Sequence, residues 1–136
     1  MLVGVALGAM IGIERQIHHH TAGFRTFTLI CTASTLAMLV SIYVCQTNMD
    51  LHNGDPGRIA AQVLTGIGFI GAGLILKGND GIQGLTTAAC IFVCAVIGLA
   101  VGAGMLTLSA IVTVFVVIIL WSSYFKKRDE DKNKRP

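Results

Sequence analysis

Charged residues are scarce in this sequence. They make up 12% of its 136 residues, whereas 54% are hydrophobic. A soluble domain usually carries about 25% charged residues, so the composition excludes an ordinary soluble domain and favours a protein that lies in lipid. At this length the chain can form one bundle of membrane helices and little else.

A basic surface and paired cysteines are also lacking. Six of the ten Lys and Arg residues follow Phe125, so the net charge of +3 belongs to a tail and gives no support for nucleic-acid binding. Cys31, Cys45, Cys90 and Cys94 lie in apolar runs without CxxC spacing. That spacing argues against a disulfide framework and a zinc site. It favours free thiols used as small core residues, with redox sensing as the other interpretation.

Apolar runs without charge predict about five membrane helices, over residues 1–13, 26–49, 59–76, 86–101 and 105–125. The last two share a charge-free stretch whose helical length of about 68 Å is twice what one crossing needs, so a turn is expected at the GAG of residues 102–104. The first run covers only about 20 Å, so it is either mismatched to the bilayer or begins upstream. The expected fold class is an all-α polytopic membrane helix bundle.

The run of residues 59–76 is the one around which we expect the bundle to be organised. Asp55 and Pro56 precede it and form a helix-start signal. Small residues let backbones approach closely in lipid, which predicts a helix at the centre of the bundle. The glycines of this run are Gly66, Gly68, Gly71 and Gly73. Their GxGxxG pattern does not indicate a dinucleotide site, because no strand precedes it.

Two other runs carry a helix-packing pattern. Gly4, Gly8 and Gly12 form two overlapping GxxxG steps, and Gly98 and Gly102 form another. These faces predict close contacts between helices. The helix after residue 105 has few small residues, so we expect it to face lipid.

Polar residues near the helix ends allow several interpretations. Arg58, Gln62 and Thr65 share one helix face, which is either an interfacial arginine with two side chains bonded to neighbouring helices or a functional polar patch. Glu14 and Arg25 flank the first loop, where they either form an ion pair or reach the headgroups separately.

The first loop also contains two further features. Arg15 is expected beside Glu14 where the first helix leaves the hydrocarbon. His18, His19 and His20 are adjacent, so on a helix their side chains would diverge, whereas metal ligands converge. A solvated loop is therefore favoured over a metal or pH-sensing site.

The distribution of positive charge predicts the orientation of the chain. If the charged tail of residues 126–136 is cytoplasmic, nine of the ten Lys and Arg residues lie inside and only Arg58 lies outside. By the positive-inside rule, this places the carboxyl end of the chain in the cytoplasm and the amino end outside. The transmembrane domain then comprises residues 1–125.

Four segments resemble the MgtC/SapB family of bacterial inner-membrane proteins. They are GAMIGIERQ (8–16), TAGFRT (21–26), DPGRIAAQVLTGIGFIGAG (55–73) and GLTTAACIFV (84–93), in the family's order and spacing. The resemblance implies adaptation to low magnesium and, in some members, virulence and survival inside host cells. It also implies regulation of other membrane machinery, notably the proton-driven ATP synthase. Longer members carry a soluble C-terminal domain where this chain has its short tail, and Phe92 stands where the family more often has Trp.

Three classes of function follow. A regulator that docks its helices against a membrane partner is favoured, because no Asp or Glu lies inside the second to fifth runs, where an ion carrier would need one. A small, oligomeric channel or transporter lined by the Arg58 face is the alternative. An enzyme is not expected, since no nucleophile, base and acid stand at a recognisable spacing.

The expected sites and partners are correspondingly simple. No catalytic residue, metal ligand or cofactor is predicted. The expected partners are the lipid bilayer, a membrane protein such as the ATP synthase, and a second copy of the chain. The candidate functional polar residues are Glu14, Arg15, Arg25, Thr26, Asp55, Arg58, Gln62, Thr65, Thr86 and Thr87.

Overall fold

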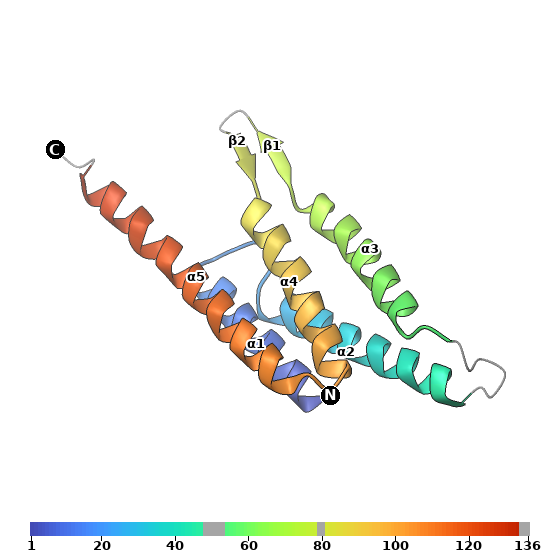
Figure 1. Ribbon diagram of the computed structural model, residues 1–136. Helices are drawn as coiled ribbons and strands as arrows, with labels where there is room; N and C mark the ends of the chain where they lie inside the picture. The colour runs from blue at the N-terminus through green and yellow to red at the C-terminus, as the bar shows by residue number, and fades with distance from the viewer. Residues whose placement is uncertain (48–53, 79–80, 134–136) are drawn as a thin grey trace.

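The computed structural model describes residues 1–47, 54–78 and 81–133, and within them the chain is mainly helical. Successive helices run in alternating directions (Figure 1), so the structure confirms the predicted all-α membrane helix bundle. The helices are α1 (Leu2–Ile17), α2 (Phe24–Thr47), α3 (Gly57–Gly73), α4 (Leu85–Gly102) and α5 (Leu106–Asn133). Strands β1 (Leu76–Gly78) and β2 (Gly81–Gln83) form an antiparallel hairpin between α3 and α4.

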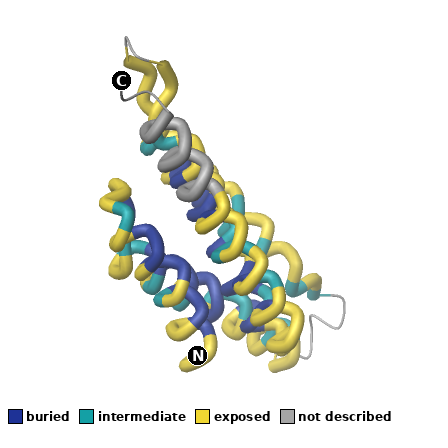
Figure 2. Tube along the Cα trace, turned by 90° about the vertical axis from the view of Figure 1, so that its left-hand side faces the viewer, coloured by how far each residue is buried: buried dark blue, intermediate teal, exposed yellow. Residues whose placement is uncertain are grey.

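The centre of the bundle is α2, which packs against α1 on one side and α4 on another. Figure 2 shows the buried residues concentrated along these elements. The expectation that residues 59–76 form the central helix is wrong, because only Ile67 and Gly71 of α3 are buried. Small residues permit close approach but do not determine which helix receives a neighbour.

Two helices, α2 and α4, are long and apolar enough to cross a membrane, and residues 106–122 of α5 form a shorter apolar segment. Several predicted helix boundaries differ from those of the structure. The first helix continues past Ile13 to Ile17, and the third ends at Gly73 rather than Leu76. Leu76 instead pairs with Gln83 in the hairpin.

The turn between α4 and α5 lies at residues 103–105, next to the glycines that predicted it. The amide of Ala103 donates to Leu99, and that of Met105 donates to Ala100, both at 2.9 Å. Gly104 has a φ of +85°, which a residue with a Cβ adopts only with strain. Beyond this turn most side chains of α5 up to Trp121 are exposed, while Ser109, Thr113 and Leu120 face the core.

Candidate functional site

Charged residues are buried at the carboxyl end of α1. Glu14 and Arg15 are only 6% and 3% exposed. Both continue the buried face formed by Leu7, Gly8 and Ile11, which recurs every three or four residues. The interpretation that Glu14 reaches the headgroups is therefore wrong, because the helix and its buried face continue past Ile13.

Glu14 is bonded within its own helix. Arg15 Nε donates to Glu14 Oε2 at 2.7 Å, and Arg15 Nη2 lies 3.4 Å from Oε1. His18 Nδ1 lies 3.3 Å from the same Oε1 and 2.9 Å from the Glu14 carbonyl oxygen. The carboxylate thus faces Arg15 and His18 and not Arg25, so the proposed Glu14–Arg25 ion pair does not form.

The guanidinium of Arg15 has one unused donor. Its Nη1 is buried and has no hydrogen-bond partner among the described residues. The side chain lies next to Cys90 at the start of α4, so it joins α1 to that helix. A buried ion pair of this kind stabilises little by itself, but removing one partner leaves an uncompensated charge.

The glycines of α1 and α4 lie against α2 from two sides. A Cβ at Gly8 would stand 2.7 Å from Cys31 Cβ, and one at Gly12 would stand 2.7 Å from Phe24 Cα. At Gly102 it would stand 2.6 Å from Met38 Cβ. Such separations are too short for any real Cβ, so the close approach of these helices requires glycine.

The remaining glycines of these faces behave in the same way. A Cβ at Gly4 would meet the Thr35 hydroxyl at 2.5 Å, and one at Gly98 would meet the carbonyl oxygen of Cys31. The Cys94 thiol of α4 also donates to the carbonyl oxygen of Phe27, at 3.3 Å. These contacts hold α1 and α4 against α2.

In contrast, the glycines of α3 are mostly uncovered. A Cβ at Gly66, Gly68 or Gly73 would have no atom within 4 Å. Gly71 alone faces another helix, with Ala88 Cβ of α4 at 3.7 Å. The expected packing of Gly66, Gly68 and Gly73 against helices of the same chain therefore does not occur.

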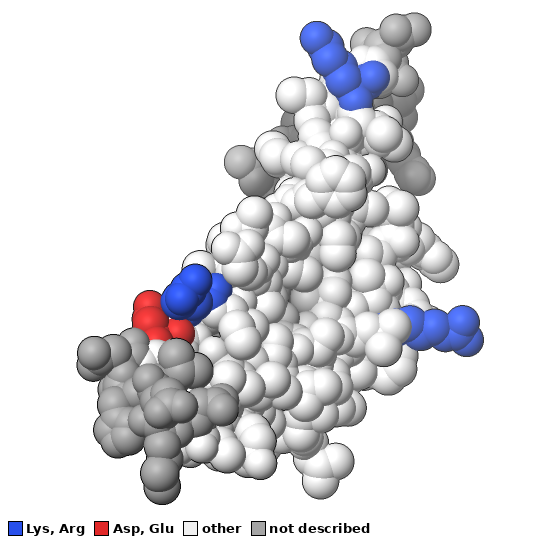
Figure 3. All heavy atoms as spheres, turned by 90° about the vertical axis from the view of Figure 1, so that its right-hand side faces the viewer, with Lys and Arg blue, Asp and Glu red and all other residues white. Residues whose placement is uncertain are grey.

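The polar face of α3 is on the outside of the chain. Arg58, Gln62 and Thr65 are all exposed, and Thr65 Oγ1 donates to Ala61 of its own helix at 3.0 Å. Asp55 Oδ1 accepts the Gly57 amide at 2.7 Å, although the N-cap residue of α3 is Pro56 and not Asp55. Figure 3 shows that charged side chains occupy only a few separate places on this face of the molecule.

The structure does not bring the candidate polar residues into one site. Asp55 precedes α3, and Arg58, Gln62 and Thr65 lie on that helix. The others occupy the end of α1 and the starts of α2 and α4, which meet toward the opposite end of the bundle (Figure 1). Thr87 is buried and Thr26 half-buried, whereas Thr86 and Arg25 are exposed. Among the described residues, no three His, Cys, Asp or Glu side chains gather as metal ligands would.

Two contacts were missed by the sequence reasoning. Ser41 Oγ donates to the Pro56 carbonyl oxygen at 2.7 Å and joins α2 to the start of α3. Gln16 Oε1 accepts the Phe24 amide at 3.3 Å and caps α2. Sequence spacing gives no signal for either bond, because each joins residues that only the fold brings together.

A model of the MgtC family matches residues 1–128 of the chain. "Putative magnesium transporter YhiD" of Escherichia coli (strain K12) is 50% identical over 122 residues, which cover 88% of this chain and 56% of that protein. "Protein MgtC" of Brucella abortus (strain 2308) is 40% identical over 115 residues, or 83% and 45% of the two chains. "Protein MgtC" of Salmonella typhimurium is 38% identical over 117 residues, or 86% and 48%.

These relatives extend beyond the region that they share with this chain. The chain spans about half the length of the curated relatives it matches. No solved structure matches it.

Proposed function

Because this chain belongs to the MgtC family, we propose that it acts in the bacterial inner membrane during adaptation to low magnesium. We further propose that it acts by regulating other membrane machinery through helix contacts. The observation that carries this second step is the uncovered glycine face of α3.

The α3 face consists of Gly66 together with Phe69, Ile70 and Gly73, which lie three, four and seven residues from Gly66 and so share one side of the helix. The glycines have open space where a Cβ would stand, and Phe69 and Ile70 are 83% and 47% exposed. In lipid, glycines of this kind allow a second helix to approach to backbone distance, and a protruding aromatic side chain adds contact area.

The other two glycine faces are unsuitable for a partner. Cys31 of α2 occupies the space beside Gly8 and the space beside Gly98. An incoming helix would therefore have to displace the core of the bundle. The α3 face is the remaining glycine face of the described chain that can receive a helix without such a change.

The partner that we propose is a membrane-spanning helix of another complex. The resemblance described above makes the proton-driven ATP synthase the first candidate, with survival inside host cells as the setting in pathogenic species. A second copy of this chain is the alternative occupant. We also propose that the carboxyl end is cytoplasmic, since nine of the ten Lys and Arg residues then lie on the inner side.

Transport of magnesium is the second candidate function, and the name of the Escherichia coli relative favours it. Glu14 weighs in its favour as well, since it is buried in the bundle and not at an edge as the sequence suggested. However, both oxygens of that carboxylate already face Arg15 or His18. Magnesium requires several oxygen ligands, and Glu14 supplies none that is unoccupied.

Crosslinking in cells tests the regulator. A photoreactive amino acid at position 69 should give adducts with a membrane protein during growth at low magnesium. Gly66→Leu should remove these adducts without affecting the fold, because Gly66 shares the face of Phe69 and the space beside it is open. The matched control is position 115 of α5, where Phe115 is also exposed. Identical adducts from positions 69 and 115 would contradict the α3 face as the contact.

A flux measurement separates the two functions. Liposomes that contain the purified chain should take up magnesium no faster than empty liposomes if the protein is a regulator. Uptake above that background would support transport and contradict the proposal.

A further inference from the structure

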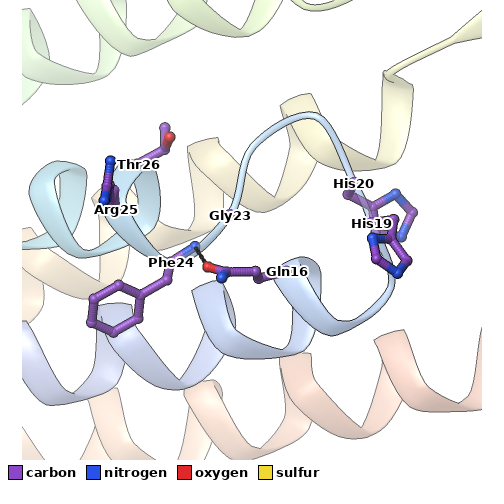
Figure 4. A pocket seen from close by; sticks show the side chains of 7 residues that line it. All are labelled: Gln16, His19, His20, Gly23, Phe24, Arg25 and Thr26. Atoms are coloured by element: carbon purple, nitrogen blue, oxygen red, sulfur yellow. Dashed lines mark hydrogen bonds between the residues drawn. The ribbon is translucent and has the colours of Figure 1, made fainter.

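An open pocket of about 750 Å³ lies where α1 ends and α2 begins. It is separate in sequence and in structure from the α3 face on which the proposed function depends. Gln16 of α1, His19 and His20 of the connecting loop, and residues 23–26 at the start of α2 line it. Figure 4 shows Arg25 and Thr26 on the first turn of α2, the two histidines across the loop, and Gln16 bonded to Phe24 between them.

The lining of this pocket carries positive charge and no acid. Arg25 is exposed there, and the lining residues include no Asp or Glu. The nearest acid along the chain, Glu14, is turned into the bundle and bonded to Arg15. The charge of Arg25 is therefore not neutralised by a carboxylate of the pocket, which favours an anionic ligand.

Backbone amides at the start of α2 also favour an anionic ligand. The amide of Phe27 makes a helical bond to the Gly23 carbonyl oxygen at 3.2 Å, so the amides of residues 24–26 precede the first turn of bonds. Gln16 occupies the amide of Phe24, while Arg25 and Thr26 remain on the pocket lining. The positive end of a helix of 24 residues thus faces the pocket.

We propose that this pocket binds an anionic phosphate group, carried either by the headgroup of an anionic lipid or by free phosphate. The guanidinium of Arg25 has the planar donors that pair with two phosphate oxygens. The Thr26 hydroxyl and the amides of the first turn supply further donors, and His19 and His20 of the connecting loop complete the lining. The volume of the pocket accommodates a phosphate with a glycerol attached.

Lipid retention measured by native mass spectrometry tests this site. The full chain, purified in detergent, is mixed with phosphatidylglycerol or with zwitterionic phosphatidylcholine. We expect preferential retention of phosphatidylglycerol and about tenfold weaker retention by Arg25→Gln, the change expected when a hydrogen bond to a charged group is lost. Arg58→Gln is the matched control, because Arg58 is also an exposed arginine at the start of a helix.

A phosphate titration identifies the source of the ligand. Displacement of the lipid by millimolar inorganic phosphate would show that the pocket accepts the free ion, whereas retention of the lipid would assign it to a headgroup; both results support the site. Equal losses in Arg25→Gln and Arg58→Gln, or equal retention of the two lipids without phosphate binding, would overturn it. Crosslinks from position 69 do not depend on this pocket, so the failure of either proposal can be recognised separately.

Discussion

The backbone carbonyl oxygen of Cys31 lies directly against Gly98, in the space that a side chain at that position would occupy. On the other side of α2, the Cβ of Cys31 fills the space beside Gly8. Cys31 of α2 therefore sets the distance from α2 to α1 and the distance from α2 to α4. This arrangement fixes the bundle through backbone contacts and leaves α3 outside it.

Substitution of these glycines separates the core from the α3 face. We expect Gly98→Ala to lower the free energy of unfolding by about 1–3 kcal/mol, because the new methyl group must displace backbone atoms of α2. Gly66→Ala should leave it unchanged or raise it slightly, since open space surrounds that position. Unfolding of the purified protein in mixed detergent, followed by circular dichroism, measures both. Equal effects of the two variants would contradict the contacts described for α2.

The bond between Ser41 and Pro56 connects α2 to the start of α3. Ser41 is buried, and its hydroxyl has no water to replace the Pro56 carbonyl. We expect Ser41→Ala to destabilise the protein by about 1 kcal/mol and to increase proteolysis near residue 54. Thr47→Ala is the control, because Thr47 is exposed and its hydroxyl donates to Tyr43 of its own helix. Unchanged proteolysis in Ser41→Ala would show that α3 is held by other contacts.

The predicted orientation can be tested at two exposed positions of the structure. Asp55 precedes α3 and Ile82 lies in the hairpin that follows it, so they lie at opposite ends of that helix. In a chain whose own cysteines are replaced, Asp55→Cys should react with a thiol reagent that does not cross the membrane when it is added to whole cells. Ile82→Cys should react only after the cells are opened. Labelling of both in whole cells would contradict a crossing by α3.

How much of this could be predicted from the sequence depends on what each pattern measures. The absence of charge over long runs predicts membrane helices, and the GxxxG faces of residues 4–12 and 98–102 coincide with the closest helix contacts. The sequence predicts the equally glycine-rich α3 at the centre of the bundle, because its glycines indicate that another helix can approach its backbone closely. Whether a helix of the same chain approaches it depends on the path of the loops.

The burial of Glu14 and Arg15 was missed for a different reason. The first apolar run stops at the first charged residue, so the predicted first helix ends at Ile13. The buried face nevertheless continues at the helical spacing from Ile11 to Glu14 and Arg15. A reading by periodicity, which allows a charged pair to occupy a buried face, would have extended the helix.

The ion pair at the end of α1 gives the last prediction. Glu14→Gln removes the charge that compensates Arg15, whose Nη1 already lacks a partner among the described residues. We expect this change to destabilise the protein by about 3 kcal/mol, because it leaves a buried guanidinium without a counter-charge. Adding Arg15→Gln to the same chain should recover part of that loss, so the double variant should cost less than the sum of the two single variants.

Arg25→Gln serves as the control, since Arg25 is exposed and its loss should change the free energy of unfolding by less than about 0.5 kcal/mol. Unfolding curves for the unchanged protein, the two single variants and the double variant form a double-mutant cycle. The cycle isolates the coupling between Glu14 and Arg15. If the losses in the two single variants simply added, Glu14 and Arg15 would be independent. The 2.7 Å bond between them would then contribute nothing to the stability of the bundle.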